Sequence, residues 1–265
     1  MYFFIILALI IIIKIWLLFY HTTKVKTEEI NLKSDKISDE IAILQLSDFH
    51  FDGRGKLEKN LKKKIREVEY DLVVLTGDYL NDEDKLAEFI TFLKELEFKT
   101  KVFAVSGNHD YFKNIEEIRD NFEKEGIIFL ENESKKINLK GNEINIIGVG
   151  SPDGDHDDFR KAVNGLNLTE GYNLVLSHTY HILDSIKNYE VDLVLAGDTH
   201  GGQMIYPLIG KILLNIFFET KYLAGKYEIE NTTLYVNRGL GTSLLPFRFN
   251  AYPEITQLKI RNSLK

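Results

Sequence analysis

The stretch IAILQLSDFHFDG, residues 41–53, begins as an apolar run of strand length and ends in polar side chains. Four further runs have the same form: DLVVLTGD at 71–78, KVFAVSGNHD at 101–110, YNLVLSH at 172–178 and VDLVLAGDTH at 191–200. Short runs rich in Val, Ile and Leu favour buried strands, and amphipathic segments such as 56–70 and 85–98 favour helices. The sequence therefore predicts an α/β domain in which stacked sheets are covered by helices.

Each of these five runs ends in a side chain that can bind a metal ion: Asp48, Asp78, Asn108, His178 and Asp198. Ligands of α/β sheets gather at the carboxyl ends of the strands, so we expect the five side chains to converge at one edge. Converging carboxylates repel one another unless a cation lies among them. The runs therefore predict a metal site.

Short motifs extend these polar ends with residue types that suit such a site. Asp48 and His50 form a D-x-H triplet whose side chains can point to one side and grip one ion, and Asp78 supplies a carboxylate able to bridge two ions. GNHD at 107–110 adds an amide, an imidazole and a carboxylate, and AGDTHGG at 196–202 adds a carboxylate and an imidazole. Mixtures of imidazole and carboxylate suit Mn, Fe or Zn, whereas oxygen-rich sites favour Mn or Mg.

This ordered set, D-x-H, G-D, G-N-H-D, a lone His and G-x-T-H, resembles the calcineurin-like metallophosphoesterases over about residues 42 to 260. The resemblance implies a four-layered α/β/β/α sandwich and two divalent metal ions, with Mn (manganese) favoured and Mg, Fe or Zn as alternatives. It also implies the metal ligands: Asp48, His50 and His200 for the first ion, Asn108 and His178 for the second, and Asp78 bridging both.

The resemblance further implies that His109 contacts the phosphate and protonates the leaving oxygen, while Asp110 orients its imidazole. These roles agree with two-metal chemistry, in which two cations about 3.5–4 Å apart activate a water molecule, and a positioned His supplies a proton. The family has His where this chain has Asp198. A carboxylate can still bind the second metal, and we expect it to favour Mn or Mg over Zn.

The C-terminal stretch RGLGTSLLPFRFNAYPEI, residues 238–255, and the GGQ at 201–203 resemble the membrane-associated YaeI/YkuE-type branch of the family. This branch includes enzymes similar to the UDP-2,3-diacylglucosamine diphosphatases of lipid A biosynthesis. Arg238 and Arg248 are candidate contacts for the substrate phosphate, with structural salt bridges as the alternative. Residues 205–223 are unusually apolar and could be core, or could contact the membrane and admit an acyl chain.

Residues 1–20 are apolar apart from one lysine and are just long enough to span a membrane. A cleaved signal peptide would have a basic start and a small-residue cleavage site, and neither is present; a buried core helix is the other alternative. We predict a transmembrane anchor at 1–20, a charged linker at 21–40 and the metallophosphoesterase domain at 41–265. Lys24 and Lys26 then place the domain in the cytoplasm, on a single-pass protein of the cell membrane.

The composition excludes some classes of substrate and of metal site. The chain has 33 Lys and Arg against 40 Asp and Glu, for a net charge of −7, which offers no basic surface for a nucleic acid. It has no cysteine, which excludes disulfides and thiolate metal sites. We therefore hypothesise a membrane-bound hydrolase of a lipid-linked diphosphate such as UDP-2,3-diacylglucosamine.

Two alternatives remain. One is a broad phosphodiesterase or phosphatase that acts on phospholipids or small phosphoesters. The other is a non-catalytic interaction module that keeps the fold, although the presence of His109 and Asp110 speaks against it. The sequence gives no prediction of the oligomeric state.

Overall fold

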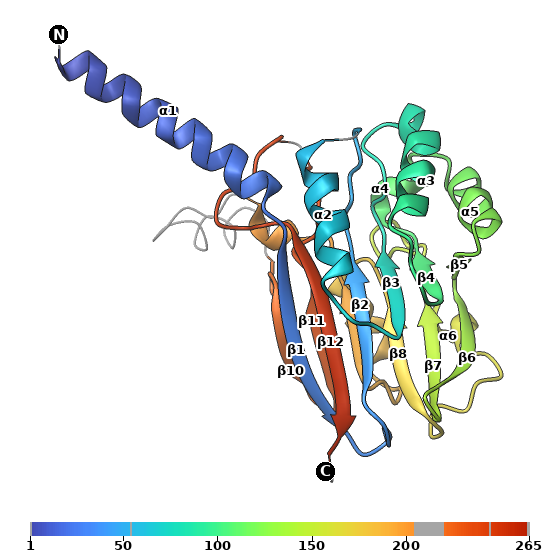
Figure 1. Ribbon diagram of the computed structural model, residues 1–265. Helices are drawn as coiled ribbons and strands as arrows, with labels where there is room; N and C mark the ends of the chain where they lie inside the picture. The colour runs from blue at the N-terminus through green and yellow to red at the C-terminus, as the bar shows by residue number, and fades with distance from the viewer. Residues whose placement is uncertain (1, 54, 204–219, 244, 264–265) are drawn as a thin grey trace.

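The computed structural model describes residues 2–53, 55–203, 220–243 and 245–263. Two six-stranded sheets lie face to face, with strand orders β1-β12-β2-β3-β4-β5 and β10-β11-β9-β8-β7-β6 (Figure 1). The strands of the first sheet are β1 Lys26–Ser34, β2 Ile41–Leu46, β3 Leu72–Thr76, β4 Val102–Val105, β5 Ile128–Phe129 and β12 Glu254–Asn262. Those of the second are β6 Glu133–Leu139, β7 Asn142–Gly148, β8 Tyr172–Leu176, β9 Leu193–Ala196, β10 Gly225–Ile229 and β11 Thr232–Val236.

The central strands are buried on both faces, which explains why their sequences are apolar without interruption. Successive side chains of a strand point to opposite faces. In β3, Leu72 and Val74 pack between the two sheets, whereas Val73 and Leu75 pack in the cluster on the outer face of the first sheet. The main core therefore lies between the sheets.

Helices cover the outer faces of both sheets. Over the first sheet lie α2 Lys56–Arg66, α3 Leu86–Glu95 and α5 Ile115–Lys124, which bury Leu61, Phe89 and Phe122 against it. Over the second lie the short helices α6 Phe159–Ala162 and α7 Leu183–Ile186, which bury Phe159 and Ile186. The structure therefore has the predicted four layers, two sheets between two layers of helices.

The central strands run parallel within each sheet, β2 to β5 in the first and β7, β8, β9 and β11 in the second. Their carboxyl ends therefore lie at one edge of each sheet. The two edges are joined directly, because the Gln45 amide at the end of β2 donates a hydrogen bond of 2.9 Å to Ala196 O at the end of β9. This arrangement brings loops from both sheets together.

The segment predicted as a linker contains a strand. Residues 26–34 form β1, which pairs in parallel with β12 from Lys26 opposite Glu254 to Ser34 opposite Asn262. β1 lies at the edge of the sheet, and within it only Leu32 is fully buried. A charged edge strand guards a sheet against pairing with other chains, and its polar residues give it the composition of a linker.

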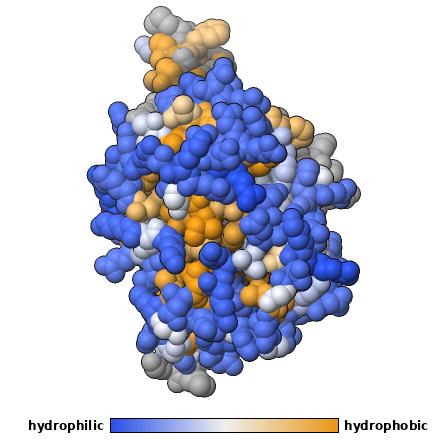
Figure 2. Space-filling view, turned by 90° about the vertical axis from the view of Figure 1, so that its right-hand side faces the viewer, coloured by the Kyte–Doolittle hydropathy of each residue, from blue (hydrophilic) through white to orange (hydrophobic). Residues whose placement is uncertain are grey.

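Helix α1, Tyr2–Thr23, projects away from the sandwich (Figure 1). It exposes large apolar side chains, among them Trp16 and Phe19, and over Phe4–Thr23 it is long and apolar enough to cross a membrane by length and composition. By contrast, the face of the domain at the right of Figure 1 is mostly hydrophilic, with hydrophobic residues near its middle (Figure 2). Of the apolar segment 205–223, residues 205–219 lie outside the described residues, so its proposed contacts stay a prediction.

Candidate metal centre

The predicted site residues lie in the loops that leave the carboxyl ends of the central strands, and five of them have strained backbones. Asp48, His50, Asp78, Asp198 and His200 have positive φ angles between 40° and 73°. This left-handed conformation is costly for residues other than glycine, and such strain clusters at functional sites. The local backbone is therefore shaped to bring these side chains together.

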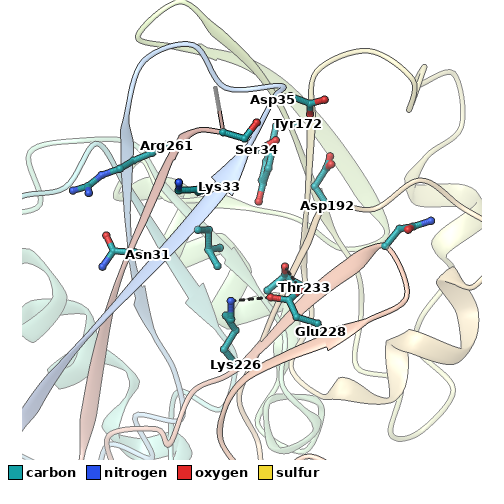
Figure 3. Close-up of a pocket in the computed structure, with 13 residues that line it drawn as sticks. Asn31, Lys33, Ser34, Asp35, Tyr172, Asp192, Lys226, Glu228, Thr233 and Arg261 are labelled. Carbon is teal, nitrogen blue, oxygen red and sulfur yellow. Dashed lines mark hydrogen bonds and ion pairs between the residues drawn. The ribbon is translucent and has the colours of Figure 1, made fainter. Parts of the chain in front are cut away.

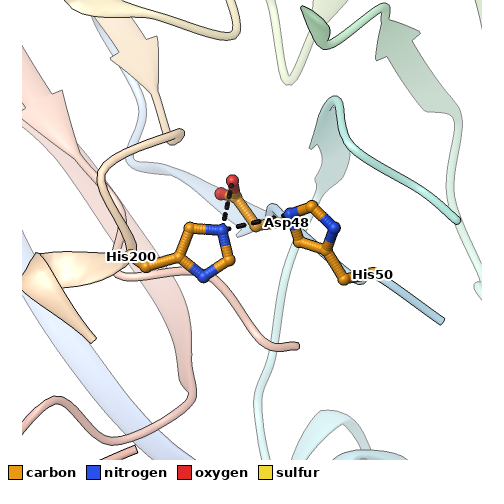
Figure 4. A group of neighbouring side chains, drawn as sticks. All are labelled: Asp48, His50 and His200. Atoms are coloured by element: carbon orange, nitrogen blue, oxygen red, sulfur yellow. Dashed lines mark hydrogen bonds and ion pairs between the residues drawn. The ribbon is translucent and has the colours of Figure 1, made fainter. Parts of the chain in front are cut away.

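Asp48, His50 and His200 form one group of side chains (Figure 4). The Nε2 atom of His200 lies 3.1 Å from Nε2 of His50 and 3.5 Å from Oδ1 of Asp48. All three residues are buried. Two imidazole nitrogens and a carboxylate oxygen so close together form a ligand set for one ion.

Asp78 lies between this group and a second one. Its Oδ2 atom is 3.2 Å from Nε2 of His50 and 3.3 Å from Nε2 of His178. Nε2 of His178 is also 3.6 Å from Oδ1 of Asp198. The Asp78 carboxylate therefore faces both groups, which is the placement that a bridging ligand needs.

Outer hydrogen bonds orient two of the imidazoles. Nδ1 of His50 contacts Asn81 Oδ1 at 3.0 Å, and Nδ1 of His178 contacts Thr76 O at 2.7 Å. Because both partners are oxygens that accept, each Nδ1 carries a proton. Each Nε2 then faces the cluster, where it would bind an ion once it has released its own proton. Asn81 was not predicted from the sequence, since it belongs to no motif and reaches His50 only through the fold.

Two buried atoms of the predicted ligands of the second ion have no hydrogen-bond partner, Nε2 of His178 and Oδ1 of Asn108. Buried polar atoms nearly always have a partner, and a divalent ion would satisfy both of these. The donor set of imidazole, amide and carboxylate groups therefore fits two divalent metals.

The charges in the cluster also favour cations. Burial opposes the ionisation of Asp78, but His178 and His50 beside it hold the pKa of Asp78 well below its usual value. For Asp48, burial outweighs its neighbours and raises the pKa to about 6. Divalent ions would relieve the cost of holding these carboxylates together.

His200 is oriented differently from the other two imidazoles. Its Nδ1 lies 3.1 Å from Nη2 of Arg248, which can only donate a hydrogen bond. Burial and the Arg248 charge hold the pKa of His200 well below its usual value. The neutral ring therefore carries its proton on Nε2, facing His50. To bind a metal ion at Nε2, the ring would release that proton and become an imidazolate, whose negative charge the Arg248 guanidinium at Nδ1 would balance.

His109 is half-buried at the rim of the cluster, with a ligand atom within 4.8 Å of those of His50 and Asp78. Its backbone N donates to Asp78 Oδ1 at 3.0 Å, which fixes the turn against the bridging carboxylate. Burial lowers the pKa of His109. The ring is thus close to the cluster and open to solvent.

Among the described residues no hydrogen bond or ion pair joins Asp110 to the His109 imidazole, so its role as the residue that orients that ring stays a prediction. Its carboxylate accepts three backbone hydrogen bonds, from the N–H groups of Gly107 (2.7 Å), Asp78 (2.8 Å) and Tyr79 (2.9 Å). It therefore ties the loop after β4 to the loop after β3. The sequence does not reveal this, because Asp110 is aimed by the turn of α4, Asn108–Tyr111.

Two glycines are required by the close approach of the backbone to the carboxylates. A Cβ atom on Gly107 would lie 2.1 Å from Oδ1 of Asp78, and one on Gly239 would lie 2.6 Å from Cβ of Asp48. Gly239 also has a φ of 68°. These glycines serve close packing rather than phosphate binding.

Neither predicted phosphate-binding arginine points freely into the cluster. Arg238 pairs with Glu254 and lies 3.8 Å from Glu28, which is the salt-bridge alternative. Arg248 is fully buried and makes no ion pair among the described residues.

A separate polar hollow of about 650 Å³ lies between the edge strands β1 and β10 (Figure 3). None of the predicted site residues lines it. Several of its charged groups pair with neighbours, Lys226 with Glu228 at 2.8 Å and Asp192 with Lys36 at 2.9 Å. The chemistry of the chain is therefore concentrated at the strand ends.

Comparisons with known proteins agree with this geometry. The family model of calcineurin-like phosphoesterases matches residues 41–202. An uncharacterized metallophosphoesterase of Aquifex aeolicus (strain VF5) is 31% identical over 89% of this chain and 92% of its own length. Phosphodiesterase YaeI of Escherichia coli (strain K12) is 30% identical over 72% of this chain and 70% of its own length.

Among solved structures, TT1561 of Thermus thermophilus superposes with a TM-score of 0.50 and 13% identity, over 76% of this chain and 91% of that one. At this identity the likeness concerns the fold alone.

Proposed function

The chain belongs to the calcineurin-like phosphoesterase family, and from that premise we propose that it is a two-metal hydrolase of phosphodiesters or diphosphates at a membrane surface. The observation that carries the proposal is the buried cluster in which Asp78 lies 3.2 Å from His50 and 3.3 Å from His178. The unpartnered atoms of His178 and Asn108 support a second metal beside the first.

The proposed ligands follow the two groups in the structure: Asp48, His50 and His200 for the first metal, Asn108, His178 and Asp198 for the second, and Asp78 for both. When bound, the two ions supply charge that neutralises phosphate oxygens and lowers the pKa of a water molecule. We expect Mn or Mg to serve this chain well, because Asp198 contributes an oxygen where the family has an imidazole.

His109 is proposed to hold the proton for the leaving oxygen. It lies at the rim, half-exposed, so a substrate phosphate at the cluster could reach its ring. Asp110 would support this role indirectly, because it fixes the turn through Gly107, Asp78 and Tyr79.

A lipid-linked diphosphate, such as UDP-2,3-diacylglucosamine, is the substrate that we propose first. Outside α1, the exposed large hydrophobic residues of the described chain are Phe112 and Leu245, which are 78% and 53% exposed. Phe112 ends the turn that begins at His109, and so it would meet an acyl chain beside the site. A broad phosphodiesterase is the second candidate, favoured by the 30% identity to the phosphodiesterase YaeI.

The two candidates differ in what they hydrolyse. We would compare release of uridine monophosphate from UDP-2,3-diacylglucosamine in detergent micelles with hydrolysis of bis(p-nitrophenyl) phosphate. The lipid proposal expects a kcat/KM at least about tenfold higher on the lipid substrate, which corresponds to about 1.4 kcal/mol of transition-state binding. Equal efficiency on both would favour the broad enzyme.

We also propose that α1 anchors the chain with the domain in the cytoplasm. Lys24 and Lys26 follow α1 and lie over the ring of Tyr252, at 5.9 Å and 3.9 Å from its centroid. Basic and aromatic residues are typical of a membrane interface, and basic ones of its cytoplasmic side. Protease added to intact spheroplasts should leave the domain whole, and digestion there would reverse the topology.

A further inference from the structure

Arg248 is a fully buried arginine that makes no ion pair among the described residues, although the charges of Asp48 and Glu254 nearby favour its protonated form. Its donors bond instead to main-chain oxygens, Gly241 O at 2.7 Å, Arg238 O at 2.8 Å, Ala251 O at 3.2 Å and His200 O at 3.3 Å. The remaining contact is the one to Nδ1 of His200 at 3.1 Å. Burial of an unpaired charge is costly, so this arrangement needs a reason beyond packing.

The fork of the guanidinium holds His200 at two points, its carbonyl oxygen and its ring nitrogen. Lysine has one compact ammonium group and cannot reproduce a planar fork of five donors. Arg248 therefore fixes both the backbone and the ring plane of this proposed metal ligand.

The backbone of Arg248 is hydrogen-bonded to helix α1. The N–H of Arg248 donates to Thr22 Oγ1 at 2.8 Å, and that hydroxyl in turn donates to Leu18 O at 2.7 Å. Thr22 lies in the last turn of α1, so the helix end and the loop before β12 are directly bonded.

Neighbouring aromatic contacts reinforce the junction. The His21 ring lies 5.3 Å from that of Phe249 and 4.6 Å from that of Tyr252, and the rings of Phe19 and Phe247 are 6.1 Å apart. In Figure 1 the loop before β12 accordingly lies at the base of α1. A continuous path of contacts therefore runs from α1 through Arg248 to the metal cluster.

We propose that Arg248 is a positioning residue that couples the contact between α1 and the loop before β12 to the orientation of His200. Through His200, this contact would set the affinity of the first metal position. The inference rests on the proposed metal centre and deepens it. Outer hydrogen-bond partners of a metal-binding histidine typically change metal affinity 10- to 100-fold when they are replaced. If the end of α1 moved away from the loop before β12, the affinity of the first metal position would fall. The second metal position would be unaffected, because its ligand His178 is oriented by Thr76 O.

The first test uses the full-length chain in detergent with Arg248→Gln and Arg248→Lys, and with Arg66→Gln as a control at an exposed arginine. Calorimetric titration with Mn²⁺ should show one of two sites weakened by about 10- to 100-fold in both Arg248 variants. The second site and the control should match wild type. Two unchanged affinities in Arg248→Gln would overturn the proposal, as would rescue of wild-type affinity by lysine.

The second test addresses the link to α1 and covers the case in which the Arg248 variants fail to fold. Thr22→Val removes the acceptor of the Arg248 N–H, whereas Thr23→Val is matched to it, because the Thr23 hydroxyl contacts Phe19 O within the helix. Thr22→Val should weaken the same metal site several-fold and Thr23→Val should not. Equal affinities in the two variants would show that the helix end does not reach the site.

A metal-independent readout separates this inference from the proposed function. In the chelator-treated chain, the ¹⁵N resonance of His200 Nδ1 should report an acceptor, and it should shift in Thr22→Val but not in Thr23→Val. A wild-type chain that binds no Mn²⁺ would contradict the proposed function, while an unchanged resonance in Thr22→Val would contradict the coupling.

Discussion

At the scale of the residue, His109 is the side chain whose chemistry can be separated from the structure around it. Its ring is half-exposed, and the turn that carries it is fixed by backbone bonds to Asp78 and Asp110 rather than by the imidazole. A substitution of the ring should therefore change the reaction and leave the fold intact.

His109→Ala should lower turnover by about 10²–10⁴-fold on a diester with an alkyl leaving group, because loss of general acid catalysis has this size. On a p-nitrophenyl ester the loss should be much smaller, since that leaving group needs no proton. Metal content and melting temperature should match wild type. Full turnover of the alkyl ester would remove His109 from the mechanism.

Asp198 tests the identity of the second metal. Its carboxylate is 3.6 Å from Nε2 of His178 and 29% exposed, so it can turn toward a bound ion. Asp198→Ala should lose the second metal, and Asp198→His should shift activation from Mn or Mg toward Zn, because imidazole is a softer ligand than carboxylate. Activation profiles with the three metals would check this. A fully active Asp198→Ala with two metals would show that Asp198 is a bystander.

The inner ring of candidate ligands could be predicted from the sequence, because each one directly follows a recognisable apolar strand. The outer residues could not. Asn81 supports His50, Asp110 binds three backbone N–H groups, and Arg248 holds His200 across 48 positions of sequence. Such contacts depend on the loop conformations that the fold imposes, and no periodicity or spacing records them.

At the scale of the element, β1 is the strand that its polar composition made hard to predict from the sequence. Its nine residues pair with β12, whose Ile255, Leu258 and Ile260 are fully buried. Its burial alternates along the strand, but the covered face carries Glu28 and Ser34 as well as Ile30 and Leu32. Only two apolar residues therefore mark the strand in the sequence, and the prediction of a linker failed over residues 26–34 for that reason. The central strands, which are covered on both faces, could be predicted because burial makes them continuously apolar.

Truncation should separate α1 from β1. Removal of residues 2–17 keeps Thr22 and β1, so the melting temperature of the domain should change by only a few degrees. Removal of residues 2–36 deletes β1 and uncovers β12, where the loss of even one buried side chain such as Leu32 costs about 1.5–3 kcal/mol. At about 2–4 °C per kcal/mol for a domain of this size, its melting temperature should fall by more than about 5 °C. Differential scanning calorimetry would compare the two, and equal stability would make β1 dispensable.

At the scale of the whole molecule, the two sheets meet where three carboxylates and three imidazoles are drawn together. Asp48 and Asp78 are buried and Asp198 is partly exposed, and their mutual repulsion opposes the packing of the sheets at this edge. Divalent ions would convert that repulsion into attraction, so the metal centre should also stabilise the fold.

Metal removal should therefore lower the stability of the domain. A ligand that binds only the folded state at 100 times its Kd contributes about 2.7 kcal/mol, which corresponds to roughly 5–10 °C in melting temperature for this size. Thermal scans of the chain with Mn²⁺ and with chelator should show at least this difference. In Asp78→Asn, which lacks the carboxylate that faces both groups, Mn²⁺ should raise the melting temperature only slightly. If Mn²⁺ raised the melting temperature of this variant as much as that of wild type, the stabilising ions would bind elsewhere.

The most direct measurement is a titration of the chelator-treated, full-length chain with Mn²⁺, with bound metal and the hydrolysis of bis(p-nitrophenyl) phosphate recorded on the same samples. The arrangement of Asp78 between His50 and His178 predicts no turnover without metal and a maximum when two ions are bound per chain. Turnover that persists in the metal-free chain, or a folded chain that binds two ions at the cluster and hydrolyses no phosphoester, would contradict it.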